Sequence, residues 1–201
     1  MSSDILLSTA YLPPIEYFAL IAGSPGILIE KEENYTKQSY RNRCYILSAH
    51  GPLLLSVPAM IGYSHKTIIK DIRIDYTKRW QQVHLGALSA AYRASPYFEF
   101  YFGGLEAAIK KRHDFLFDLN SELTEILLKM LKLDKKPVYT SEFIPLDTRK
   151  NDYRYLLTPK KNSGYSAREY TQVFEYRGPF AGNLSIVDLI FNMGPDSVRY
   201  L

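Results

Sequence analysis

A strand–helix–strand pattern in residues 5–30 constrains the fold of this chain more than any other feature of its sequence. The apolar runs ILLSTA (5–10) and GILIE (26–30) predict short buried strands, and IEYFALIAG (15–23) predicts a helix that Pro14 opens and Gly23 ends. Strands joined through a helix pair in parallel, with a right-handed crossover. The sequence therefore predicts an N-terminal βαβ unit, and the loops at the carboxyl ends of its strands are favoured positions for a ligand.

The following segments predict antiparallel strands and packed helices. The runs at 43–49 and 52–59 flank His50-Gly51 and predict a hairpin, and IIKDIRID (68–75) predicts a further strand. Helices are predicted at 77–96 and at 105–117, and a third helix is predicted to follow Asn120 as its N-cap. A fourth helix is predicted after Ser185, where Asp188 completes a capping box and Gly194-Pro195 ends the helix. The predicted fold class is α/β, with a mixed sheet that contains the βαβ unit and an antiparallel hairpin, and with packed helices.

Length and composition narrow the class of protein. A chain of 201 residues, 46% of them hydrophobic, favours a single domain over residues 1–201. The net charge of +4 is small for a dedicated nucleic-acid binder, so we expect no nucleic-acid partner, whereas phosphorylated small molecules fit. A single Cys excludes an internal disulfide framework. The N-terminus lacks a signal-peptide pattern, and no apolar stretch approaches the roughly 20 residues that are needed to span a bilayer. We therefore expect a cytoplasmic protein with no membrane span, and the oligomeric state stays open.

Motifs that identify a metal or dinucleotide site are absent. The chain has no CxxC, HExxH, GxGxxG or GxxxxGK[ST] pattern, so no cofactor is indicated, and its four His are too widely spaced to predict a metal site. His84 follows Trp80 by one helical turn and is a candidate general acid or base. Its pattern alone favours the alternative, a core histidine hydrogen-bonded inside the helix face. Cys44 is interpreted as a small buried residue.

The stretch YTKQSYRNRCYI (35–46) is a candidate anion site. If a strand begins here, Arg41 and Arg43 point to one face and Asn42 to the other. A guanidinium group matches phosphate and carboxylate oxygens bidentately. The alternative is a solvated strand entrance, in which Glu30, Glu32 or Glu33 pairs with the arginines. A second candidate is the stretch 149–161, which has five basic residues and one acid, and in which two Tyr lie among the basic residues in a pattern that also suits stacking on bases.

Several segments together resemble the WbqC-like protein family. They are YLPPIEYFALI (11–21), ILIEKEENYTKQSYRNRCYI (27–46), Val57-Pro58, W-x-x-x-H-L from Trp80, Y-x-x-S-P-Y-F from Tyr92, and NLSIVDLIFNMGPDSVRYL (183–201). The resemblance places recurring family positions at Tyr11, Pro13, Tyr17, Lys37, Asn42, Arg43, Trp80, His84, Tyr92, Pro96 and Phe98. The family often has an Asp-Asp pair where this chain has Glu32-Glu33, which keeps the charge and changes the reach.

The resemblance also implies a biosynthetic context, because some members lie in gene clusters for O-antigen and other surface polysaccharides. We expect a transferase-like enzyme that uses an activated donor, nucleotide-linked or acyl, and hence a small-molecule anionic or sugar ligand. In this reading Lys37 and Arg43 hold phosphate or carboxylate, Asn42 and Tyr17 hydrogen-bond a sugar or base with Tyr11 and Trp80 beside them, and His84 is the general base. The alternative is a non-catalytic protein whose Tyr-rich pocket binds a glycan or a partner.

Overall fold

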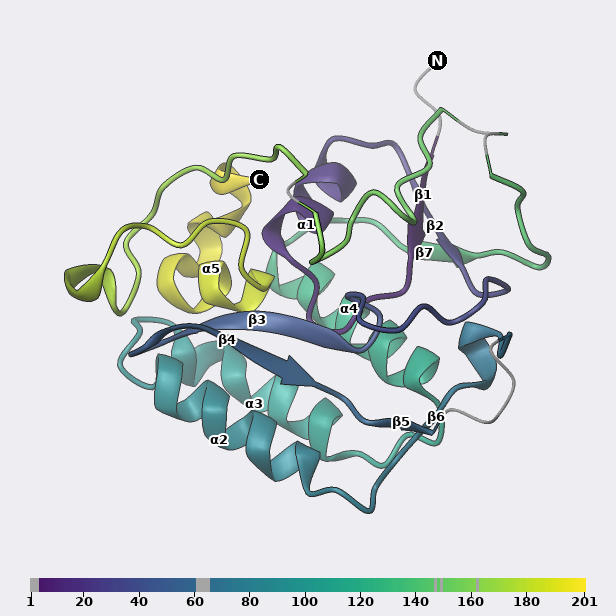
Figure 1. Ribbon diagram of the computed structural model, residues 1–201. Helices are drawn as coiled ribbons and strands as arrows, with labels where there is room; N and C mark the ends of the chain where they lie inside the picture. Colours follow the sequence, from purple (N-terminus) through teal and green to yellow (C-terminus); the bar gives the residue numbers. More distant parts are fainter. Residues whose placement is uncertain (1–3, 61–65, 147, 149, 162) are drawn as a thin grey trace.

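The N-terminal βαβ unit is present as predicted. Figure 1 shows the computed structural model, which describes residues 4–60, 66–146, 148, 150–161 and 163–201. Strands β1 (Ile5–Ser8) and β2 (Ile27–Glu30) flank helix α1 (Ile15–Ala22) and pair in parallel, with Ile5 opposite Ile27. Strand β7 (Pro137–Tyr139) adds to β2, also in parallel, which gives the order β1-β2-β7. The carboxyl ends of all three strands therefore meet at one edge.

The antiparallel part consists of two separate two-stranded sheets. Strands β3 (Arg43–Ser48) and β4 (Gly51–Ser56) form the predicted hairpin. The strand predicted at 68–75 is shorter than expected, because the 3-10 turn η1 (Ile69–Asp71) interrupts it and only β6 (Arg73–Ile74) pairs with β5 (Ala59–Met60). The parallel sheet, the antiparallel hairpins and the helices confirm the mixed α/β class.

Four further helices pack around the hairpin and the parallel sheet. They are α2 (Trp80–Tyr92), α3 (Phe98–Lys110), α4 (Leu116–Met130) and α5 (Ile186–Met193). Figure 1 shows α2 and α3 below the hairpin, with α1 and α5 above it. The short 3-10 helices η2 (Glu175–Arg177) and η3 (Gly194–Tyr200) complete the C-terminal part. Within the described residues, none of the helices is long and apolar enough to cross a membrane.

Three predicted helix boundaries are wrong, and in two of them a buried tertiary contact overrides the local signal. Helix α3 runs through Gly103-Gly104, where the predicted helix had not yet begun. Asn120 is not an N-cap but lies buried inside α4 and donates from Nδ2 to the Arg41 carbonyl at 2.8 Å. Ser185 precedes α5, but its hydroxyl donates to the Leu12 carbonyl, and Asp188 receives hydrogen bonds from distant side chains, so no capping box forms. The predicted end of α5 at Gly194, where φ is 54°, is confirmed.

Candidate functional site

A buried ion pair closes the carboxyl end of β1. Arg41 donates from Nε to Glu33 Oε1 at 2.9 Å and from Nη2 to Glu33 Oε2 at 2.6 Å. Nη2 also donates to Ser8 Oγ, at the end of β1, at 2.6 Å. The two charged side chains are only 3% and 0% exposed. The bidentate geometry fixes the plane of the guanidinium group, because a carboxylate can accept both bonds in one orientation only.

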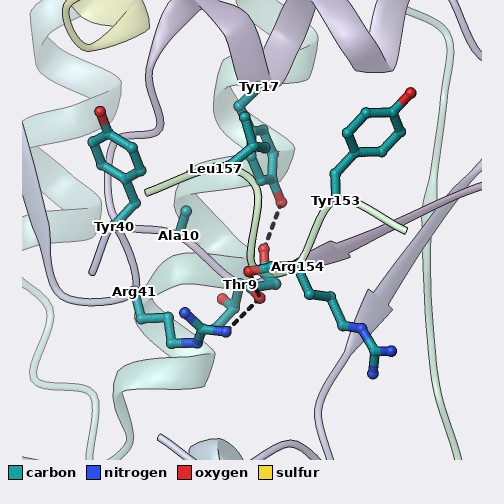
Figure 2. A pocket seen from close by; sticks show the side chains of 9 residues that line it. Thr9, Ala10, Tyr17, Tyr40, Arg41, Tyr153, Arg154 and Leu157 are labelled. Carbon is teal, nitrogen blue, oxygen red and sulfur yellow. Dashed lines mark hydrogen bonds between the residues drawn. The ribbon is translucent and has the colours of Figure 1, made fainter. Parts of the chain in front are cut away.

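A second buried pair lies beside the first. Arg154 donates from Nη1 to Glu30 Oε2 at 3.0 Å and from Nη2 to Asp152 Oδ2 at 2.5 Å. Glu30, the last residue of β2, also accepts from Thr140 Oγ1 at 2.5 Å. The Ser8 hydroxyl donates to the Arg154 carbonyl at 3.0 Å and so links the two pairs. Figure 2 shows that the Arg154 side chain extends away from that of Arg41. Each guanidinium group in this network is therefore paired with at least one carboxylate, and Arg154 is paired with two.

Arg41 keeps one nitrogen free. In the part of the chain that the structure describes, its Nη1 has no hydrogen-bond partner, although the side chain is almost fully buried. Two adjacent cavities share Arg41 in their walls. The inner cavity, shown in Figure 2, has a volume of about 10 Å³ and includes Tyr17, whose hydroxyl donates to the Ser8 carbonyl at 3.1 Å. A cavity of this size holds one water molecule. The outer cavity is larger, with a volume of about 150 Å³.

The outer cavity is rich in hydrogen-bond donors. The described residues of its lining include no carboxylate; they are Thr36, Gln38, Ser39, Arg41, Arg154, Tyr155, Leu157, Thr158 and Lys160. The Tyr155 ring lies 5.5 Å from the Arg41 guanidinium carbon, and burial raises the pKa of its hydroxyl, which stays protonated. Gln38 adopts a φ of 56°, a strained backbone conformation of the kind that is concentrated at functional sites. A space of this volume and charge suits a phosphate or carboxylate group, whereas whole drug-sized ligands need about 300 Å³ or more.

The predicted catalytic residue lines neither of the two cavities at Arg41. His84 Nδ1 is 2.8 Å from the Tyr11 hydroxyl, and the His84 ring packs edge-on against Trp80 with ring centroids 5.2 Å apart. His84 is 2% exposed. Burial lowers the pKa of its imidazole to about 4, against an opposing hydrogen bond with the Ser56 backbone. The imidazole is therefore neutral at physiological pH.

Asn42 and Arg43 lie next to this aromatic group. Asn42 donates from Nδ2 to the Val57 carbonyl at 2.9 Å, and Arg43 is paired with Ser56 in the hairpin. Three polar atoms here are buried and have no partner among the described residues: Asn42 Oδ1, Arg43 Nε and Trp80 Nε1. Buried polar atoms are rarely left unpaired without a water, a ligand or a functional reason.

The structure thus divides the predicted site residues into two groups. Tyr17 lines the inner cavity beside Arg41. A second group surrounds β3, β4 and the start of α2 and comprises Tyr11, Asn42, Arg43, Trp80 and His84. Lys37 is exposed and lines neither cavity at Arg41. Arg41 and Arg43 do not share a strand face, because β3 begins only at Arg43.

Two residues central to the structure were not recognised from the sequence. The sequence pattern places Arg154 only within the candidate anion stretch 149–161, where its neighbour Asp152 is the one signal of a buried pair. The capping pattern at Asp188 hides a second signal, because a carboxylate inside the apolar run IVDLIF indicates burial with dedicated partners. His65 and Arg149 lie outside the described residues. Among the residues that the structure describes, no three His, Cys, Asp or Glu side chains are grouped so that they could hold a metal ion.

Comparison with known proteins identifies the family. The sequence model of the WbqC-like protein family matches residues 9–165, which include the charged residues of the network around Arg41 and Arg154 but not Ser8. The chain is also 27% identical, over 229 aligned positions, to the Uncharacterized protein Rv1507c of Mycobacterium tuberculosis, and the alignment covers 100% of this chain and 99% of that protein. No solved structure matches the chain. Because the family match spans well over half of the sequence, the chain belongs to the WbqC-like protein family.

Proposed function

We propose that the protein is a transferase-like enzyme of surface-polysaccharide or related biosynthesis, and that it binds an activated donor at the carboxyl edge of the β1-β2-β7 sheet. The observation that carries this proposal is the free Nη1 of Arg41, on a guanidinium group that is 3% exposed and held in position by Glu33 and Ser8. The biosynthetic context comes from the family resemblance alone. The donor is nucleotide-linked or acyl, because both classes present phosphate groups.

The anionic group of the donor occupies the outer cavity. Arg41 Nη1 donates to one of its oxygens, and the Lys160 ammonium group reaches it from the rim of the cavity. Arg41 and Lys160 thereby take the role that the sequence suggested for Lys37 and Arg43. Because the cavity has a volume of only about 150 Å³, the remainder of the donor extends over the surface around Thr36 and Thr158.

The general base is proposed to be His84, on the acceptor side. Its neutral imidazole can accept a proton, although a pKa of about 4 makes it a weak base in the closed structure. An acceptor reaches it only when the Tyr11 and Trp80 rings move, since both pack against it. The unpaired Asn42 Oδ1 and Trp80 Nε1 atoms supply one acceptor and one donor for a hydroxyl or amine.

Isothermal titration with nucleotide sugars, free nucleotides and acyl-CoA tests donor binding. We expect one of these classes to bind, Lys160→Gln to weaken binding about three- to tenfold, and Arg41→Lys, which loses the fork geometry, to weaken it more. The matched control is Lys161→Gln, which removes the same charge from the next residue, outside the cavity lining. Equal losses in Lys160→Gln and Lys161→Gln, or no binding by any class, would contradict the proposal.

The alternative function is a binding protein without catalysis. It is favoured by one observation: the residues that line the outer cavity include no carboxylate and no imidazole that could transfer a proton. This alternative predicts the same titration result but no product. Mass spectrometry of donor and acceptor mixtures separates the two, because an enzyme releases nucleotide or CoA in proportion to time, and loses that activity in His84→Gln.

A further inference from the structure

A further cavity, larger than the two at Arg41, lies between the tip of the β3–β4 hairpin and the segment 172–181. Its volume is about 530 Å³, within the usual range of small-molecule sites. In Figure 1 the hairpin tip and η2 lie at the opposite side of the molecule from β1, β2 and β7. This cavity is therefore separate from the two cavities at Arg41. None of the site residues that the sequence predicts is among the described residues that line it.

The walls of this cavity combine flat apolar groups with positive charge. Pro52 comes from the hairpin, and Phe174, Pro179 and Phe180 come from the facing segment. Among the described residues that line the cavity, Arg177 is the one fully charged side chain, and none is a carboxylate. The rim also carries His50, which is exposed. Such a lining favours a ligand that has both a flat ring and a negative charge.

Arg177 already bridges the mouth of the cavity, but weakly. Its Nη1 lies 3.5 Å from the Ala49 carbonyl at the hairpin turn, a long contact with a neutral acceptor. An anionic oxygen at shorter range is a stronger acceptor for a guanidinium group than a peptide carbonyl is. A ligand that carries an anion can therefore replace Ala49 as the partner of Arg177 without leaving a buried group unpaired, because Ala49, whose carbonyl loses the contact, is only partly buried.

One buried carboxylate positions both walls of the cavity. Gln172 donates to Asp188 Oδ2 at 2.9 Å, and its amide also exchanges two hydrogen bonds of 3.0 Å with the backbone of Ala181. On the hairpin side, the Tyr92 hydroxyl donates to Asp188 Oδ1 at 2.8 Å and accepts from the Leu47 backbone N–H at 2.9 Å. Because both walls are fixed to Asp188, the cavity is formed before any ligand arrives, which lowers the entropic cost of binding.

We propose that this cavity is a binding site for a planar aromatic ligand that carries an anionic group, the chemistry shared by nucleoside monophosphates and aromatic carboxylates. The ring lies against Phe174 and Phe180, and the anion pairs with Arg177. This site is independent of the proposed donor site, since it uses no residue of the network around Arg41. Its occupancy gives this chain a second small-molecule ligand, whatever the reaction at the carboxyl edge.

Titration of the full chain with matched probes tests the site. Uridine 5′-monophosphate is compared with uridine, which lacks the anion, and with ribose 5-phosphate, which lacks the ring. Benzoate is compared with cyclohexanecarboxylate, which has the charge but no flat ring. We expect UMP or benzoate to bind at least about tenfold more tightly than its matched probes. Preference for UMP identifies the ligand as a nucleotide, and preference for benzoate identifies it as an aromatic carboxylate.

Variants locate the binding. Arg177→Gln is expected to weaken binding of the preferred probe by about tenfold, and Phe180→Leu by a similar factor. Arg168→Gln, which removes the same charge from an exposed residue outside the lining, is expected to bind like the wild type. Arg41→Lys is also expected to bind normally, which separates this site from the donor site. The proposal is overturned if no probe binds at millimolar concentration, or if Arg177→Gln and Arg168→Gln weaken binding of the probe by the same factor. It is also overturned if Arg41→Lys is the only variant that weakens binding.

Discussion

The buried Arg41–Glu33 pair predicts that removing one partner destabilises the protein far more than removing both. Arg41→Met leaves the Glu33 carboxylate, which is 0% exposed, without its two strongest donors. Breaking a buried pair in this way costs about 3–5 kcal/mol, because the remaining charge is neither solvated nor paired. Glu33→Met leaves the guanidinium group in the same position and is expected to cost a similar amount.

The double variant separates pairing from burial. With Met at both positions the charges are gone, and Ser8 still donates to the Arg154 carbonyl. We expect a cost within about 1–2 kcal/mol of the wild type, and therefore a coupling energy of about 3 kcal/mol or more between the two sites.

Urea unfolding measures these differences, with the fluorescence of Trp80, the single tryptophan, as the signal. The milder Arg41→Lys and Glu33→Gln variants extend the test if a Met variant does not fold. The control is the exposed pair Lys110–Glu106, with side chains 64% and 36% exposed, where removing either partner is expected to cost less than about 0.5 kcal/mol. The reasoning is refuted if Arg41→Met costs no more than Lys110→Met.

Three further predictions concern buried titratable groups. Burial lowers the pKa of His84 to about 4. The unfolded chain therefore binds more protons than the folded chain between about pH 4 and pH 6.5. As a result, the free energy of unfolding falls by about 2 kcal/mol from pH 8 to pH 5. Urea titrations of the wild type against His84→Gln measure this term, and identical pH dependence in the two proteins would contradict it. Asp188→Ala leaves the donors of Tyr92, Tyr170 and Gln172 unpaired and is expected to cost about 3 kcal/mol in urea unfolding; a cost below about 1 kcal/mol would exclude the anchoring role. Burial raises the pKa of the Cys44 thiol, so a thiol reagent at pH 8 is expected to label the native protein only as fast as it unfolds, and labelling at the rate of a free thiol would show that β3 is open.

The local parts of the fold were predictable from the sequence. The βαβ unit and the β3–β4 hairpin depend on the spacing of apolar residues within short segments and on the residues that connect these segments. Neighbouring residues specify both features. The single-domain organisation over residues 1–201 stays a prediction. So does the exclusion of nucleic acid, although the burial of Arg154 leaves one basic residue fewer on the surface of the stretch 149–161.

The site was less predictable because its contacts join distant parts of the chain. Ser8 bonds to Arg154 across 146 positions, and Glu30 to the same arginine across 124. Asn120 and Asp188 each carried a valid local signal for a helix cap, but burial gave their side chains tertiary partners instead. The anion site predicted at residues 35–46 stays a prediction. The site that we propose lies in the same stretch but uses Arg41, to which strand alternation does not apply because Arg41 precedes β3.

Anomalous diffraction from crystals soaked in tungstate, a tetrahedral analogue of phosphate, tests the central claim most directly. The account predicts an anomalous peak in the outer cavity, with an oxygen about 3 Å from Arg41 Nη1, and its loss in Arg41→Lys crystals. A cavity without tungstate, in crystals where the ion occupies other basic surfaces, would contradict an anion site at the carboxyl edge of the sheet.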